Sequence, residues 1–331
     1  MVSDRPESFE EDGILFKSTF HDNVPVRLLF YHQNGSAEER CFWVELKNNS
    51  TRMSKVVISG AMAGPSRWGV TVGHQAAIRF LETCLNGNSF RLTIMPGQTM
   101  VLLETQVAPE MVIAGYTHMH LIEGGELEVA IKNMAGKRRH FVDLPVLYKP
   151  FDPFKITPKG VFEPANLEVD VKYVAGQEAE SCVIGMAPWL IDPATGEPNN
   201  GNYGVFYRFN MNLSNPTSSK KRIGFYFVPD SILARGSFLF EGKLMETGIV
   251  RKPSQQLFAV LDLKAGESRK LTLITTPEGG SYYPARIVIA TVDDNLAPAI
   301  YPASEDQNWD EDRFKVKKEE DDDDEETTND S

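Results

Sequence analysis

Two histidines stand two positions apart in the segment Tyr116-Thr117-His118-Met119-His120. In a β-strand the side chains of residues i and i+2 share a face, so both imidazoles would reach a single metal ion. A Zn²⁺ or Cu²⁺ centre usually needs at least three protein ligands, and none of the other histidines is spaced as a third ligand. The sequence therefore favours a solvent-facing pair, with Met119 and Leu121 in the core. A metal site at His118 and His120 is the alternative, and no cofactor is expected.

Aromatic residues near turn-forming segments are the second set of candidates. Flat rings stack on sugar faces and also anchor protein interfaces. The alternative is that they close the ends of a hydrophobic core, because they lie beside Gly and Pro. The candidate binding residues are Trp189, Tyr203, Tyr282 and Tyr283.

The common catalytic signatures are absent from the sequence. It contains no Gly-x-Ser-x-Gly elbow, no Walker loop, no Gly-x-Gly-x-x-Gly and no His-Glu-x-x-His. The three cysteines, Cys41, Cys84 and Cys182, are too few and too widely spaced for a disulfide framework. The sequence thus predicts a protein that is not an enzyme.

The elements that would carry these residues are indicated by an internal repeat. Residues 46–50 and 92–99 resemble residues 213–217 and 261–268 in order and spacing. In each copy a glycine, Gly97 or Gly266, interrupts alternating apolar residues, as expected where a tight turn with positive φ joins two strands. The repeat predicts two modules of one kind.

The pattern as a whole predicts an all-β fold of two tandem immunoglobulin-like β-sandwich modules, at residues 13–149 and 167–294. Residues 1–12 are expected to be a flexible N-terminus, and the proline-rich residues 150–166 a linker. One short helix is predicted from Gly73 to Glu82, where Ala77, Ile78 and Leu81 share a face, and it is expected to cap one end of the first sandwich.

Charge is concentrated at the C-terminal end of the sequence. The chain has a formal net charge of -12, and residues 304–331 alone hold 14 acidic and 4 basic residues. Residues 295–331 are therefore expected to form a disordered acidic tail. The remainder is nearly neutral and lacks the basic surface that binds phosphates, so no nucleic-acid partner is expected. No stretch approaches the roughly 20 apolar residues of a membrane span. Residues 1–7 lack the basic and apolar regions of a signal peptide, so we expect either a cytoplasmic protein or one from which a signal has been removed.

Several short strings are spread along the chain: Pro6-Glu7, Asp12-Gly13-Ile14-Leu15-Phe16, Ala63-Gly64-Pro65-Ser66, Val72-Gly73, Pro96-Gly97, Gly201-Asn202-Tyr203-Gly204-Val205 and Pro277-Glu278-Gly279-Gly280-Ser281-Tyr282-Tyr283-Pro284. Together they resemble a group of uncharacterised secreted bacterial β-rich surface proteins, which often accompany copper-amine-oxidase-like stalk domains. A cyanobacterial family of unknown function shares the string that begins at Gly201. The resemblance covers most of residues 6–292, and it implies an extracytoplasmic or cell-surface setting without a known reaction.

The function expected from the sequence is that of a non-enzymatic surface or matrix protein that acts by protein–protein contact, including self-assembly. Two alternatives stay open. One is a metal-binding protein or metalloenzyme that uses His118 and His120. The other is a carbohydrate-binding module that recognises surface polysaccharide through the aromatic residues.

Overall fold

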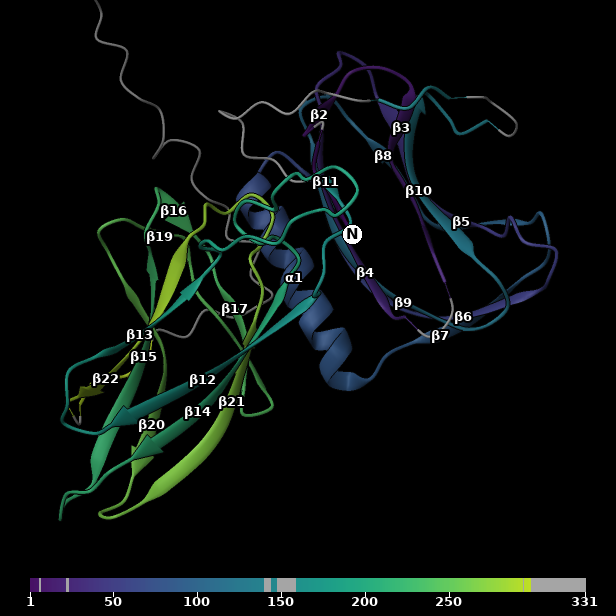
Figure 1. Cartoon of the computed structure of the whole chain (residues 1–331). Helices are drawn as coiled ribbons and strands as arrows, with labels where there is room; N and C mark the ends of the chain where they lie inside the picture. Colours follow the sequence, from purple (N-terminus) through teal and green to yellow (C-terminus); the bar gives the residue numbers. More distant parts are fainter. Residues whose placement is uncertain (6, 22–23, 140–143, 148–158, 294, 299–331) are drawn as a thin grey trace, which may run out of the picture. The chain divides into compact units, whose positions relative to one another are not determined.

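A computed structural model describes residues 1–5, 7–21, 24–139, 144–147, 159–293 and 295–298 (Figure 1). The described chain is mostly β-structure, arranged in several sheets with one helix, which agrees with the predicted all-β class. Residues 299–331, which hold most of the predicted tail, lie outside the described residues, as do residues 150–158 of the predicted linker.

Two sheets enclose the first hydrophobic core. Alternating apolar residues from both sheets, such as Phe30 and Phe42 with ring centroids 5.4 Å apart, meet between them. One sheet has the order β11-β1-β4-β9-β6-β7, with β2 paired to β4, and the other has the order β3-β10-β5-β8. The strands are β1 (Val2–Ser3), β2 (Ser8–Phe9), β3 (Gly13–Phe20), β4 (Val26–Asn34), β5 (Arg40–Lys47), β6 (Ser54–Ser66), β7 (Phe90–Ile94), β8 (Thr99–Val107), β9 (Val112–Glu123), β10 (Leu127–Ala135) and β11 (Lys159–Gly160).

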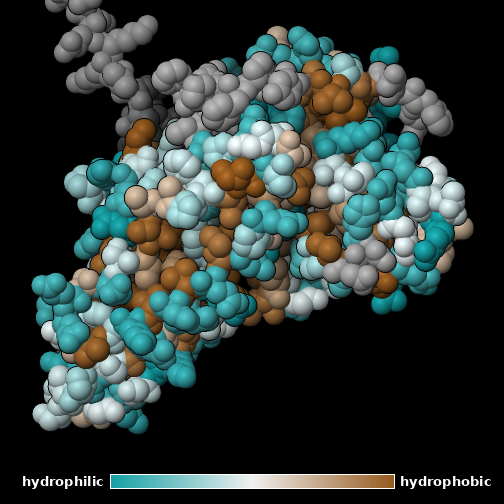
Figure 2. Space-filling model, in the orientation of Figure 1, coloured by the Kyte–Doolittle hydropathy of each residue, from teal (hydrophilic) through white to brown (hydrophobic). Residues whose placement is uncertain are grey.

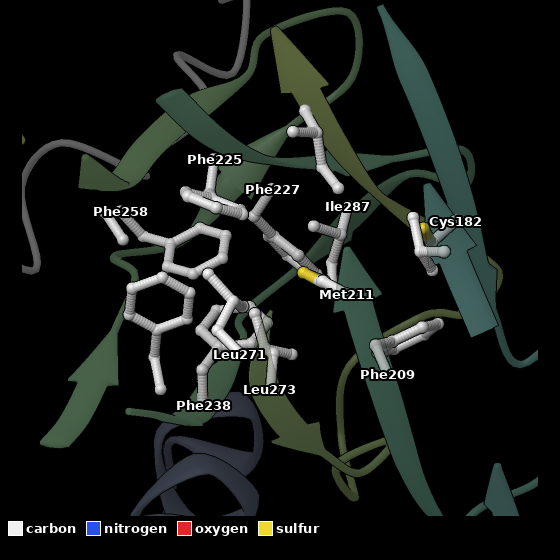
Figure 3. Packing of buried hydrophobic residues seen from close by; sticks show 14 of the residues in the cluster. Cys182, Phe209, Met211, Phe225, Phe227, Phe238, Phe258, Leu271, Leu273 and Ile287 are labelled. Carbon is white, nitrogen blue, oxygen red and sulfur yellow. The ribbon is translucent and has the colours of Figure 1, made fainter. Parts of the chain in front are cut away.

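The later strands enclose a second core that is rich in phenylalanine (Figure 3). Phe238 and Phe258 stack with ring centroids 4.0 Å apart. The sheets have the orders β12-β14-β21-β17-β18 and β13-β22-β15-β20, with a small β16-β19 pair. The strands are β12 (Asn166–Val174), β13 (Glu180–Ile184), β14 (Phe206–Ser214), β15 (Lys221–Pro229), β16 (Leu233–Ala234), β17 (Ser237–Phe240), β18 (Lys243–Glu246), β19 (Val250–Arg251), β20 (Gln256–Leu263), β21 (Ser268–Thr275) and β22 (Ala285–Val292).

The two turns singled out in the sequence have matching geometry. Gly97 joins β7 to β8 with a φ of 73°, and Gly266 joins β20 to β21 with a φ of 70°, so the predicted positive φ is confirmed. The strands that follow also pair in the same register relative to these turns. Lys47 of β5 lies opposite Thr99, and Ser214 of β14 lies opposite Ser268.

Helix α1 (Gly69–Asn86) is longer than predicted. Its apolar face, which includes Val72, Ala76 and Phe80, is buried, and the helix ends at Gly87 in the left-handed conformation. The helix lies against β6 and β9 and also contacts β17 and β18. It therefore covers the face of a sheet, where its buried side chains find apolar partners, and does not cap the end of a sandwich as expected.

The first residues differ from the expectation of a flexible N-terminus. Strands β1 and β2 pair in parallel with β4, and Val2 and Phe9 are buried. Strand β11, within the segment expected as linker, pairs with β1. Strands of two residues carry no alternating pattern, so only their long-range pairing reveals them. No helix in the described part of the chain combines the length and the apolar character that crossing a membrane requires.

Candidate functional site

The predicted histidine pair lies on β9. Met119 and Leu121 are fully buried, whereas His118 is half-buried and His120 is exposed. Burial, together with the nearby Arg27 and His120, lowers the pKa of His118 and so keeps its ring neutral at physiological pH. Within the described ranges, no three His, Cys, Asp or Glu side chains come together as a metal-binding group.

Two of the candidate aromatic residues are part of the packing. Tyr203 and Tyr283 meet edge to face with ring centroids 5.9 Å apart. The Tyr203 hydroxyl donates to the carbonyl of Ser281 at 2.7 Å, and the Tyr283 hydroxyl donates to the carbonyl of Arg235 at 3.2 Å. Burial raises the pKa of both phenols, so they remain neutral donors. These two rings hold loops in place.

The other two candidate aromatic residues present a face to solvent. The side chain of Trp189 is 41% exposed and that of Tyr282 is 49% exposed. The indole nitrogen of Trp189 donates to the carbonyl of Gly185 at 3.4 Å. Gly185 lies close to the side chain of Tyr283, the neighbour of Tyr282. The two exposed rings therefore belong to adjoining loops.

The structure also brings together a buried ionic cluster that the sequence analysis did not single out. His74 of α1 is 1% exposed and lies between two carboxylates. Its Nδ1 is 2.9 Å from Glu278 Oε2, and its Nε2 is 2.6 Å from Glu246 Oε2. Arg235 Nη2 is 3.7 Å from the same Glu246 oxygen. We call His74, Arg235, Glu246 and Glu278 the ionic cluster.

The electrostatics of the ionic cluster favour the charged imidazolium. Burial alone would lower the pKa of His74, but the charge of Glu278 and hydrogen bonds to Glu246 and Glu278 outweigh burial and raise it. Burial alone would raise the pKa of Glu278, but the charge and hydrogen bond of His74, with help from Ser237 and Arg235, lower it. Two positive and two negative groups thus compensate one another away from water.

The chemistry open to this cluster is limited by its own contacts. A histidine that acts as a general base needs a free ring nitrogen within reach of the proton it removes. Both nitrogens of His74 are held by carboxylates, and Glu278 is fully buried. The arrangement is suited to fixing α1 against the segments that carry Glu246 and Glu278.

A second contact missed by the sequence analysis centres on Arg27 of β4. Its guanidinium carbon lies 3.7 Å from the centre of the Phe206 ring, a cation–π geometry. Its Nη1 donates to the carbonyls of Ala165 at 2.9 Å and Gly204 at 3.1 Å, and its Nη2 donates to Asn166 Oδ1 at 3.0 Å. Burial lowers the pKa of Arg27 to about 10, which leaves it charged at neutral pH.

Comparisons with known proteins give no family. No family model and no curated protein matches the chain. Among solved structures, the PBSX exported protein XepA is 9% identical with a TM-score of 0.19, covering 85% of this chain and 86% of that chain. The tandem CBM22-1-CBM22-2 domains of Paenibacillus barcinonensis Xyn10C are 10% identical with a TM-score of 0.18, covering 90% and 93%. Likenesses of this size support no conclusion about function.

Proposed function

We propose that this chain is a non-enzymatic protein of an extracytoplasmic surface or matrix, and that it acts by protein–protein contact. In this proposal the chain consists of two tandem immunoglobulin-like modules that present sheet edges and loops to a partner. The extracytoplasmic setting follows from the resemblance of the sequence to secreted β-rich surface proteins. The matching turns at Gly97 and Gly266 support the two-module interpretation.

The observation that carries the proposal is that His74 uses both of its ring nitrogens in structural contacts. The side chain of His74 is shielded from water, and both of its ring nitrogens are bound by carboxylates of the ionic cluster. Arg27 is likewise committed to a ring and to backbone carbonyls. Groups that could transfer protons or bind anions are thus used for rigidity, which suits a frame that positions surfaces.

Cross-linking in the source cells tests this proposal. Intact cells are treated with a membrane-impermeant, lysine-reactive cross-linker, and the linked peptides of the full chain are mapped by mass spectrometry. We expect cross-links to a reproducible protein partner, formed through lysines on sheet edges or loops. Protection of the chain from the impermeant reagent would contradict the surface location. Labelling without any reproducible partner would contradict the contact function.

A second candidate function, glycan binding, is favoured by the exposed faces of Trp189 and Tyr282. On the face drawn in Figure 2, hydrophobic residues reach the surface in several separate places among hydrophilic ones. Two exposed rings on adjoining loops are a minimal platform for a sugar. A glycan array with the native protein and the Trp189→Ala variant tests this function, with Tyr203→Phe as a control that keeps the inner ring. Binding that Trp189→Ala removes would support a carbohydrate-binding module.

A further inference from the structure

The loop between β21 and β22, residues 276–284, carries the exposed ring of Tyr282, and we call it the Tyr282 loop. From Glu278 to Ser281 its sequence is Glu-Gly-Gly-Ser, so this part of the loop has no apolar side chain to bury. Hydrophobic packing therefore contributes little to its position. Its position depends on backbone contacts and on the side chain of Glu278, which is fully buried.

One side of the Tyr282 loop faces α1 and the sheet beneath it. The Gly279 carbonyl lies directly against Gly73 of α1, and the hydroxyl of Tyr116 on β9 donates to the Pro277 carbonyl at 3.2 Å. The carboxylate of Glu278 reaches the helix between these two contacts. The loop therefore lies where the helix and the later strands meet.

The other side of the Tyr282 loop is bound by single hydrogen bonds. The backbone N–H of Tyr282 donates to the Leu233 carbonyl at 3.0 Å, and the backbone N–H of Ser281 donates to the Glu278 carbonyl at 3.3 Å. The Ser281 hydroxyl accepts from the backbone N–H of Arg235 at 3.0 Å. These amide protons exchange with water when the loop leaves its place, so they report on its release.

The proton on His74 determines whether both carboxylates of the ionic cluster are satisfied. A charged imidazolium has two N–H groups, so it donates to Glu278 and Glu246 at the same time. A neutral imidazole has one N–H, so one of the two carboxylates then faces a ring lone pair at 2.9 or 2.6 Å. Loss of the proton therefore turns one attractive contact into a repulsive one.

Arg235 decides which carboxylate is left without a cation. Its Nη2 is 3.7 Å from Glu246 Oε2, so Glu246 keeps a positive group beside it when His74 is neutral. The one ion pair of Glu278 within the described ranges is that with His74. With His74 neutral, Glu278 is a buried anion without an ion-pair partner, which is costly until the loop moves and water reaches the carboxylate.

We infer that the proton on His74 controls the Tyr282 loop, which is held in place while His74 is charged and is released when His74 becomes neutral. Burial lowers the pKa of His74, but the charge of Glu278 and the hydrogen bonds of Glu246 and Glu278 raise it above the ordinary value of 6.5. The loop is therefore held at neutral pH and released as pH rises through the folded pKa. This inference deepens the candidate binding function of Tyr282 and rests on it for its biological role.

Amide hydrogen exchange of the full chain without ligand, measured from pH 6 to 9 and corrected for the intrinsic pH dependence of exchange, tests the inference. Peptides covering residues 276–284 should lose about 10-fold in protection for each pH unit above the folded pKa of His74, because one proton is released. Peptides covering residues 268–275 of β21, which is paired on both sides, should keep their protection. NMR of the histidine rings measures the titration of His74 directly, and the His74→Gln protein identifies its signal.

The Glu246→Gln variant moves the pH of release. It keeps a hydrogen-bond acceptor for His74 but removes one negative charge, so the loss of protection should begin about one pH unit lower. Glu168→Gln is the matched control, because it makes the same change at a side chain that is 69% exposed. The native chain alone decides the inference if Glu246→Gln does not fold.

Three results would overturn the inference. They are a His74 signal that titrates at or below pH 6.5, protection in the Tyr282 loop that does not follow this titration, and an equal loss of protection in β21, which would indicate global unfolding. None of these measurements uses a ligand, so they are independent of the glycan array. A negative array with a loop that follows His74 would remove the glycan function and leave the pH control in place, and array binding with a loop that ignores pH would do the reverse.

Discussion

Gly73 of α1 and Gly279 lie in direct contact, and the carbonyl oxygen of Gly279 occupies the space that a β-carbon on Gly73 would need. A glycine inside a helix costs stability unless something requires its small size. The neighbouring Gly279 in turn lies against the ring of Tyr31. Close approach of two backbones therefore explains a glycine at the fifth residue of a helix that otherwise buries apolar side chains.

The Gly73→Ala variant should be less stable than the native chain. In an unhindered helix this change would raise the free energy of unfolding by as much as about 1 kcal/mol. Here the methyl group meets a backbone carbonyl, so we expect a net loss on the order of 1 to 3 kcal/mol in urea unfolding. Glu82→Ala, an exposed change on the same helix, is the control and should stay within about 0.5 kcal/mol. A stabilised Gly73→Ala protein would show that α1 and the Gly279 segment do not touch in solution.

The ionic cluster predicts a large effect at His74. The His74→Gln variant leaves the buried carboxylates of Glu246 and Glu278 without the imidazolium between them, at an expected cost of about 3 to 5 kcal/mol. His21→Gln serves as the control, because His21 is exposed and its Nε2 lies 3.9 Å from the carboxylate of Glu126, which is also largely exposed. Equal stability of the two variants by chemical denaturation would argue against a charged His74.

The same cluster predicts how stability depends on pH. The raised pKa of His74 contributes stability that is complete below the ordinary histidine value of 6.5 and is lost as pH rises through the folded pKa. The lowered pKa of Glu278 contributes stability that is present above its ordinary value of 4.5 and is lost as pH falls through the folded pKa. We expect unfolding free energies measured from pH 4 to 9 to decline on the alkaline side in the native chain. The His74→Gln variant should lose that alkaline decline, and an unchanged profile would contradict the assignment.

Three buried asparagines organise turns in the same way. Each side-chain amide donates to the carbonyl of the last residue of a strand, just before a turn that is distant in sequence. Each side-chain oxygen accepts from the backbone N–H of the Ser or Thr two residues after the asparagine. The amide contacts are Asn34 to Val107 at 2.8 Å, Asn48 to Ile94 at 2.9 Å and Asn215 to Leu263 at 3.1 Å. Two of these turns, at Gly97 and Gly266, are predicted from the sequence. The third is not, because Glu110, with a φ of 62°, takes the place of glycine there.

Substitutions at these turns should act in opposite directions. Glu110→Gly relieves a non-glycine residue of a positive φ and should stabilise the chain by about 1 kcal/mol. Gly97→Val and Gly266→Val impose that conformation on a β-branched residue and should each cost about 1 to 3 kcal/mol. Thermal unfolding of the three variants checks the signs. Unchanged stability in both valine variants would contradict the repeat alignment on which this prediction rests.

Local patterns in the sequence were sufficient to predict the β-class, the turns at Gly97 and Gly266, and the helix, since each depends on neighbouring residues. The ionic cluster could not be predicted this way, because His74 and Glu278 are separated by 204 positions and neither belongs to a known motif. A buried histidine on a helix is common as ordinary packing, and only the fold reveals two carboxylates on either side. The contact of Arg27 with Ala165, 138 positions away, could not be predicted from the sequence for the same reason.

The last prediction concerns the histidine pair on β9. Because His118 is half-buried, His120 is exposed and no third ligand lies near them within the described ranges, the pair should not form a metal centre. We expect the His118→Gln/His120→Gln protein to keep its melting temperature, and the native protein after dialysis to hold less than one equivalent of Zn or Cu by elemental analysis. The His21→Gln protein is the control for unspecific histidine binding. One equivalent of metal that survives dialysis in the native and control proteins, and falls about 10-fold or more in the double variant, would instead establish a metal site at His118 and His120.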